Sequence, residues 1–83
     1  MMHARLYCSA MQSQELLRAF GKHLRGLREK RGLSQERLAE LADLHRNYTG
    51  LLERGGSNPT LLAIVALARA LKVRPAKLIE RLR

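Results

Sequence analysis

The apolar positions in the first third of the chain recur at a helical spacing. Over residues 14–31 they are separated by four, four and three residues: Leu16, Phe20, Leu24 and Leu27. This spacing places them on one face of an amphipathic helix, and Ser13 is its expected N-cap. Gly32 is expected to end the helix.

Two shorter helices are predicted next. Ser34 is a suitable cap for a helix over residues 35–41, and Glu36 is favourably placed near the positive end of this helix. The buried side of the helix is expected to contain Leu38, Ala39, Leu41 and Ala42. The apolar pattern then breaks for about three residues around Asp43, and helical signals resume near His45 and continue to residue 53 or 54.

The last third of the chain contains a loop and two further helices. Residues 55–59 read Gly-Gly-Ser-Asn-Pro and indicate the loop. Thr60 then caps a helix over Leu61–Leu71 that is apolar on nearly every side, so we expect it in the middle of a bundle. Pro75 suits the first turn of a fifth helix. The apolar stripe of this helix consists of Leu78, Ile79 and Leu82.

These elements predict an all-α fold, a compact five-helix domain over residues 13–83. Residues 1–12 show neither helical nor strand periodicity, and we expect a flexible tail there. A chain of 83 residues supports one core, and with aromatic residues at 4% that core must consist mainly of aliphatic side chains.

The charge of the chain points to a polyanionic partner. Sixteen Lys and Arg residues stand against seven Asp and Glu residues, which gives a formal net charge of +9. Nucleic acid is the first candidate for such a field, and an anionic membrane surface is the second.

Catalysis, metals and cofactors have little support in the sequence. Cys8 is the only cysteine, so no intrachain disulfide can form, and a reducing cytoplasm is the simplest setting. Neither metal-ligand spacing nor a nucleophile–base set is present, and we expect no enzyme activity, metal or cofactor. The first residues lack the apolar segment of a signal peptide, and the longest nearly apolar run, residues 61–68, is far shorter than the roughly 20 residues of a membrane span.

The third predicted helix divides into two faces. At about 100° per residue, one face is expected to meet the core and contains His45, Tyr48, Thr49 and Leu52. The opposite face contains Arg46, Asn47, Gly50 and Arg54, with Leu51 at its edge. Cations and an amide on the second helix of a tightly joined pair suit the major groove of DNA, although an ordinary solvated helix has the same polarity.

The segment over residues 33–55 resembles the lambda-repressor/Cro-like helix-turn-helix family, also called the XRE family. The shared features occur in order at fixed spacing: Arg28, Gly-Leu-Ser-Gln at 32–35, Leu38-Ala39, Tyr48, Leu-Glu-Arg-Gly at 52–55, Asn-Pro-Thr at 58–60 and Leu71-x-Val73. The resemblance covers about residues 20–82 and implies a sequence-specific DNA-binding transcriptional regulator. The run Arg46-Asn47-Tyr48, followed by Glu53-Arg54, is most similar to controller proteins of restriction–modification systems, and prophage repressors and antitoxins share much of it.

The resemblance implies roles for individual residues. Gln35 would bind a phosphate and brace the recognition helix, whereas Arg46 and Asn47 would read bases, since Arg pairs well with guanine and Asn with adenine. His45 would reach the DNA or only start the helix.

Further positions carry implied roles in the same helix and in the loop after it. Gly50 would permit close approach of the DNA, and Leu51 would contact a thymine methyl group or pack within the chain. The phosphate-contacting positions would be Arg54, Ser57 and Asn58.

Some matched positions concern stability. Arg28 and Glu53 would form a structural ion pair between the first and third helices. Three residues depart from the family pattern: Asp43 and Lys72 stand where Gly is usual, and Arg37 stands where a capping-box Glu is frequent.

One recognition helix reads few base pairs, so we expect a homodimer on a symmetric operator in double-stranded DNA. Its expected interface is the stripe of Leu78, Ile79 and Leu82. An antitoxin or other protein-interaction module of the same fold is the alternative, with residues 1–12 as the segment that binds the protein partner. A membrane-surface protein is a third interpretation.

Overall fold

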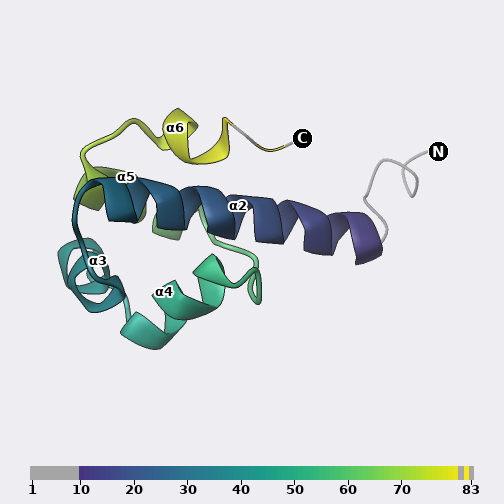
Figure 1. Ribbon diagram of the computed structural model, residues 1–83, viewed down its shortest axis with the longest axis horizontal. Helices are drawn as coiled ribbons and strands as arrows, with labels where there is room; N and C mark the ends of the chain where they lie inside the picture. The colour runs from purple at the N-terminus through teal and green to yellow at the C-terminus, as the bar shows by residue number, and fades with distance from the viewer. Residues whose placement is uncertain (1–9, 81, 83) are drawn as a thin grey trace.

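Five helices follow one another along the described part of the chain, close to the predicted positions (Figure 1). The computed structural model describes the backbone of residues 10–80 and 82, and the side chains of residues 13–80 and 82. No strand occurs within these residues, and the predicted all-α fold is confirmed. The helices are α2 (Ala10–Lys30), α3 (Gln35–Ala42), α4 (Arg46–Glu53), α5 (Leu61–Leu71) and α6 (Pro75–Ile79).

The start of α2 differs from the prediction. The helix begins at Ala10, so Ser13 lies inside it and does not cap it. Ala, Met and Gln at residues 10–12 are favourable helix formers, and no Gly or Pro separates them from Ser13. Residues 10–12 therefore belong to a helix, while residues 1–9 of the predicted tail lie outside the described residues.

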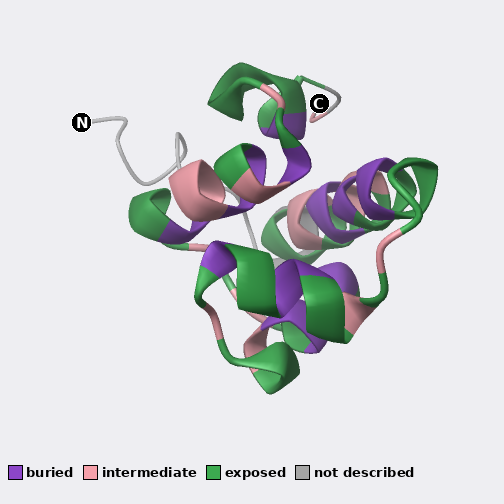
Figure 2. Ribbon diagram, turned by 90° about the vertical axis from the view of Figure 1, so that its left-hand side faces the viewer, coloured by how far each residue is buried: buried purple, intermediate pink, exposed green. Residues whose placement is uncertain are grey.

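The long helix α2 organises the packing. It contacts α4 on one side and α6 on the other, α3 packs against both α4 and α5, and α5 contacts α6 (Figure 1). Buried positions lie on the faces that the helices turn toward one another (Figure 2). The fully buried leucines of this core are Leu24, Leu38, Leu52, Leu67, Leu71 and Leu78.

The crossing of α2 and α4 requires glycine at one position. A Cβ atom on Gly21 would lie 2.4 Å from the carbonyl oxygen of Glu53 and 2.5 Å from that of Leu52. These are backbone atoms at the end of α4, and they have little freedom to move. Gly21 therefore sets how closely the two helices approach.

The helix α5 is less buried than its composition predicted. Its core-facing positions, such as Leu67 and Ala68, are buried, but Leu61 and Leu62 are 74% and 80% exposed. The packing partners α3 and α6 cover only part of this helix and leave its first turn outside. An apolar composition on every side thus does not place all of α5 in the middle of the bundle.

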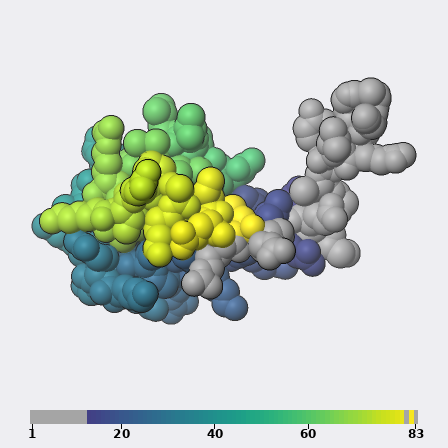
Figure 3. Space-filling view, turned by 90° about the horizontal axis from the view of Figure 1, so that it is seen from above, coloured from purple at the N-terminus to yellow at the C-terminus, as the bar shows by residue number. Residues whose placement is uncertain are grey.

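The expected interface role of Leu78 requires a correction. In Figure 3 the helix α6 (yellow) lies across the face turned to the viewer. Its Leu78 points inward and is 0% exposed, whereas Ile79 is 46% exposed. Leu82 is half-buried and packs against the core. Leu78 therefore belongs to the chain's own core, on a helix that packs against α5 and α2.

Candidate nucleic-acid interface

Local hydrogen bonds define the helix pair α3–α4. The Ser34 hydroxyl accepts from the Arg37 backbone N–H at 3.0 Å and caps α3. Asp43 then takes a left-handed conformation (φ 57°, ψ 44°), which a glycine would adopt more easily. His45 caps α4, because its Nδ1 accepts from the Asn47 backbone N–H at 3.1 Å. The turn between the helices is thus three residues long, residues 43–45.

A buried ion pair fixes α4 to α2, and the same arginine holds the segment just before α3. Arg28 donates from Nε to Glu53 Oε2 at 2.6 Å and from Nη2 to Glu53 Oε1 at 3.1 Å. Its Nη1 donates to the Leu33 carbonyl oxygen at 2.7 Å. The hydrogen bonds to Glu53 raise the pKa of Arg28, against the opposing effect of burial. The structure therefore brings together the two residues assigned to a structural ion pair.

Gln35 belongs to the same network. Its Nε2 donates to Glu53 Oε1 at 2.9 Å, so the first residue of α3 is held against the last residue of α4. A Cβ atom on Gly50 would lie 3.3 Å from Gln35 Oε1 and 3.4 Å from Arg54 Nη1. Gly50 is buried beneath these two side chains, and it makes room for them.

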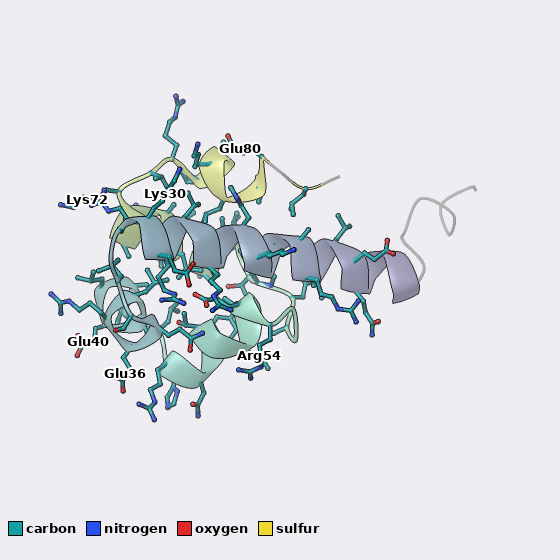
Figure 4. The ribbon with its side chains drawn as sticks, in the orientation of Figure 1. Lys30, Glu36, Glu40, Arg54, Lys72 and Glu80 are labelled. Carbon is teal, nitrogen blue, oxygen red and sulfur yellow. The ribbon has the colours of Figure 1, made fainter. Side chains whose placement is uncertain are left out.

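Polar side chains from both helices surround a shallow depression of about 300 Å³, which we call the α3–α4 depression. Its lining residues are Gln35, Glu36, Arg46, Asn47, Gly50 and Arg54. Arg46, Asn47 and Arg54 are exposed, as the helical periodicity predicted. Figure 4 shows Arg54 extending from α4 and Glu36 from α3 on the same side of the molecule.

The remaining predicted DNA-binding residues lie outside the lining of the α3–α4 depression. His45 is exposed at the start of α4, although the helical wheel had placed it on the core side. Leu51 is 36% exposed, and its side chain lies against Gly56, where a Cβ atom would meet it at 2.8 Å. Ser57 is half-buried in the loop after α4, and Asn58 is exposed there.

The sequence analysis missed two features of the surface. Glu36 was considered only as a favourable charge near the start of α3, yet it pairs with Arg46. Leu41, Leu61 and Leu62, all expected on buried sides, are 46%, 74% and 80% exposed. Two adjacent leucines directly after the capping Thr60 were a signal, since the first turn of a helix often lies at the edge of a bundle.

Other kinds of site find no support among the described residues. No group of three or more His, Cys, Asp or Glu in residues 10–80 and 82 could hold a metal ion. Across the same part of the chain, no helix is both long enough and apolar enough to span a membrane. His23 bonds through Nε2 to the Lys77 carbonyl oxygen at 2.6 Å, which ties α2 to α6.

The chain is similar to known proteins in both sequence and structure. A family model described as helix-turn-helix matches residues 24–78. Control protein C.SmaI of Serratia marcescens is 41% identical over 71 residues, which are 86% of this chain and 81% of that protein. Control protein C.BamHI of Bacillus amyloliquefaciens is 42% identical over 62 residues, 74% of this chain and 76% of that protein. The crystal structure of the restriction-modification controller protein C.AhdI from Aeromonas hydrophila matches with a TM-score of 0.74 and 50% identity, over 75% of this chain and 94% of that one.

Proposed function

The chain belongs to the helix-turn-helix family of DNA-binding transcriptional regulators, and on this basis we propose that it is a restriction–modification controller that binds a symmetric operator as a homodimer. The family consists of regulators, and the chain is not an enzyme. Its sequence relatives are control proteins, and its structural relative is a restriction-modification controller protein. Since the proposed ligand is the cell's own DNA, we expect the protein to act in the cytoplasm.

The observation that carries the proposal is the α3–α4 depression. Arg46 and Asn47 are exposed in the first turn of α4, where a helix entering the major groove meets the base edges. An Arg can bond guanine O6 and N7 together, and an Asn can bond adenine N6 and N7. We assign these two residues as base readers.

Other residues around the depression suit the phosphate backbone. Arg54 is the C-cap of α4. Gln35 begins α3, and its Nε2 donates one N–H to Glu53 and keeps a second N–H for a phosphate oxygen. We assign both to phosphates, with Ser57 and Asn58 in the following loop and His45 beside the base readers. Along α4, Gly50 and Leu51 lie between the two base readers and Arg54. The net charge of +9 supports such binding through the release of counterions from DNA.

We propose dimerisation through the exposed apolar residues of the first turn of α5 and of α6, which are Leu61, Leu62 and Ile79. Leu61 lies one turn before Ile64 on α5, and Ile64 and Ile79 line one groove of about 290 Å³. Leu82 lines the same groove. Burying exposed leucines and isoleucines against a second copy is favourable by roughly 25 cal/mol per Å² of apolar area. We propose that the two-fold axis of the dimer passes through this surface and places the two recognition helices on one face of the duplex.

Selection of bound sequences from random duplex DNA tests the DNA-binding half of the proposal. We expect a symmetric site with half-sites about 34 Å apart, one helical turn. Binding of all duplexes with equal affinity would contradict the assignment of base readers. An asymmetric single half-site would contradict the dimer.

The oligomeric state tests the proposed interface. Leu62→Asp or Ile79→Asp should give a folded monomer, because a carboxylate cannot be buried unpaired between two copies. Leu41→Asp is the matched control, since Leu41 is also 46% exposed but lies on α3. Sedimentation equilibrium distinguishes the variants, and circular dichroism verifies their helices. A dimer that survives both interface changes would exclude this surface.

A further inference from the structure

An acidic residue lies within the proposed DNA-binding surface. Glu36, in the first turn of α3, accepts a hydrogen bond from Nη1 of Arg46, in the first turn of α4. The two side chains are 65% and 63% exposed, and both line the α3–α4 depression. In Figure 4, Glu36 points away from the helices beside the start of α4.

A carboxylate in this place is unfavourable for DNA binding in general. Phosphates repel it, and the strength of nonspecific binding depends on the number of phosphates that cations neutralise. Exposed ion pairs contribute little to folding stability. The first turn of a helix does favour an acidic residue through the helix dipole, but that interaction does not require Arg46 as a partner.

The geometry of the guanidinium group permits a different use of Glu36. An Arg side chain carries five N–H donors in a planar fork. Glu36 engages Nη1, which leaves donors free for the O6 and N7 atoms of a guanine. Arg46 can therefore bond a base while it remains paired with Glu36.

A phosphate, unlike a guanine, competes with Glu36 for Arg46. It carries a negative charge, so it competes with the Glu36 carboxylate for the same cation, and the two anions repel each other when both are close to it. A neutral guanine edge causes no such repulsion. The ion pair thus penalises a phosphate-bound Arg46 more than a base-bound Arg46.

We propose that Glu36 is a positioning residue that directs Arg46 toward bases and away from phosphates, and that it thereby raises the ratio of operator affinity to nonspecific affinity. This inference rests on the proposed function of Arg46 as a base reader.

The chain offers a matched control in Glu40. It lies one turn further along α3, and its carboxylate accepts from Arg37 Nη1 at 2.9 Å in an equally exposed ion pair. Glu40 does not line the α3–α4 depression, and in Figure 4 it extends away from α4. Glu40 and Arg46 both border a second hollow beside the depression, but Glu40 bonds Arg37 and not Arg46. Glu40→Gln therefore removes the same charge and frees a neighbouring Arg while it leaves the bond between Glu36 and Arg46 in place.

The test compares two duplexes, one selected by the wild-type protein from a random pool and one with the same bases scrambled. The dissociation constants of wild type, Glu36→Gln, Glu40→Gln and Arg46→Ala are measured on both at one salt concentration. We expect Glu36→Gln to bind the scrambled duplex about 2- to 5-fold more tightly, with little change on the selected one. Glu40→Gln should change the affinities for the two duplexes by the same factor. Glu36→Asp, which keeps the carboxylate, should retain the wild-type ratio of the two affinities.

The double variant Glu36→Gln/Arg46→Ala decides whether Glu36 acts through Arg46. In the absence of Arg46, the change at Glu36 should leave the ratio of the two affinities unaltered. Equal effects of Glu36→Gln and Glu40→Gln on the ratio would overturn the inference, as would a Glu36 effect that persists without Arg46. If the wild-type protein itself fails to distinguish the duplexes, the proposed function fails, which is a separate and earlier result.

Discussion

Two Arg–Glu pairs join α4 to its neighbours, one to α2 and the other to α3, and they differ in burial and in geometry. Arg28 and Glu53 are both 9% exposed, and they bond through two N–H groups. Arg46 and Glu36 are mostly exposed and bond through one. The buried pair fixes the position of α4, whereas the exposed pair lines the α3–α4 depression, which we propose binds DNA.

This difference separates stability from recognition within one small domain. A buried charge without its partner is costly, so Arg28 and Glu53 cannot be exchanged independently of each other. An exposed charge costs little to change, so residues around the α3–α4 depression are free to vary with the DNA sequence to be read. Gln35 links the two regions, since it bonds the buried Glu53 from the edge of the depression.

The largest effect is expected from breaking the buried pair. Arg28→Met would leave the Glu53 carboxylate buried with Gln35 as its remaining side-chain donor among the described residues. We expect a loss of about 3–5 kcal/mol in the free energy of unfolding, measured by urea denaturation at a fixed protein concentration. Joint replacement by Arg28→Met and Glu53→Leu should recover part of this loss. A single variant as stable as wild type would show that the pair contributes nothing.

The second prediction concerns the close contact between α2 and α4 at Gly21, next to the buried pair. Gly21→Ala would place a methyl group against the carbonyl groups of Leu52 and Glu53 and push α4 away from α2. We expect a loss of about 2–3 kcal/mol despite the better helix propensity of Ala.

Gly26→Ala is the control for this substitution. Gly26 lies on the same helix with no atom within 4 Å of an added Cβ, so the variant should gain up to about 1 kcal/mol. Equal effects at the two glycines would mean that helix propensity alone governs both.

The positions of the helices could be read from the sequence because their signals are local. Gly32, Thr60 and Pro75 mark boundaries whatever the tertiary structure is, and α5 has the predicted bounds, Leu61–Leu71. The polar face of α4 followed from its periodicity alone. The reversed assignments of Leu62 and Leu78 have a common cause, because periodicity identifies an apolar face but not the element that covers it.

The periodicity of the sequence could not predict the ion pair of Glu36 and Arg46 either. The two residues lie ten positions apart on different helices, and their contact depends on the angle between α3 and α4. The left-handed Asp43 in the turn and the Gln35–Glu53 hydrogen bond hold α3 and α4 together, so the contact is a consequence of the tertiary structure.

The third prediction separates the two arginines on the α3–α4 depression. Arg46→Ala should cost about 1–3 kcal/mol in operator binding and relax the preference at one base position per half-site. Arg54→Ala should weaken binding to all sequences nearly equally and reduce the slope of log K against log salt by about one unit per monomer. Binding selections and salt titrations measure these effects. If Arg54→Ala alters the selected sequence and Arg46→Ala does not, the two assignments must be exchanged.

The smallest effect on folding stability is expected when the exposed pair is broken. Glu36→Gln should change the free energy of unfolding by less than about 1 kcal/mol, because the pair is solvated and its side chains lose entropy when they associate. Glu40→Gln should have a similarly small effect, since its pair with Arg37 is exposed to a similar degree. Urea denaturation at low and moderate salt measures both, and added salt should reduce the small contributions further. A loss of several kcal/mol in Glu36→Gln would show that the exposed pair also holds α4 in place, and any change in DNA specificity would then reflect a displaced helix. A small loss together with an altered affinity ratio would assign Glu36 to recognition, and Arg28 and Glu53 to the fold.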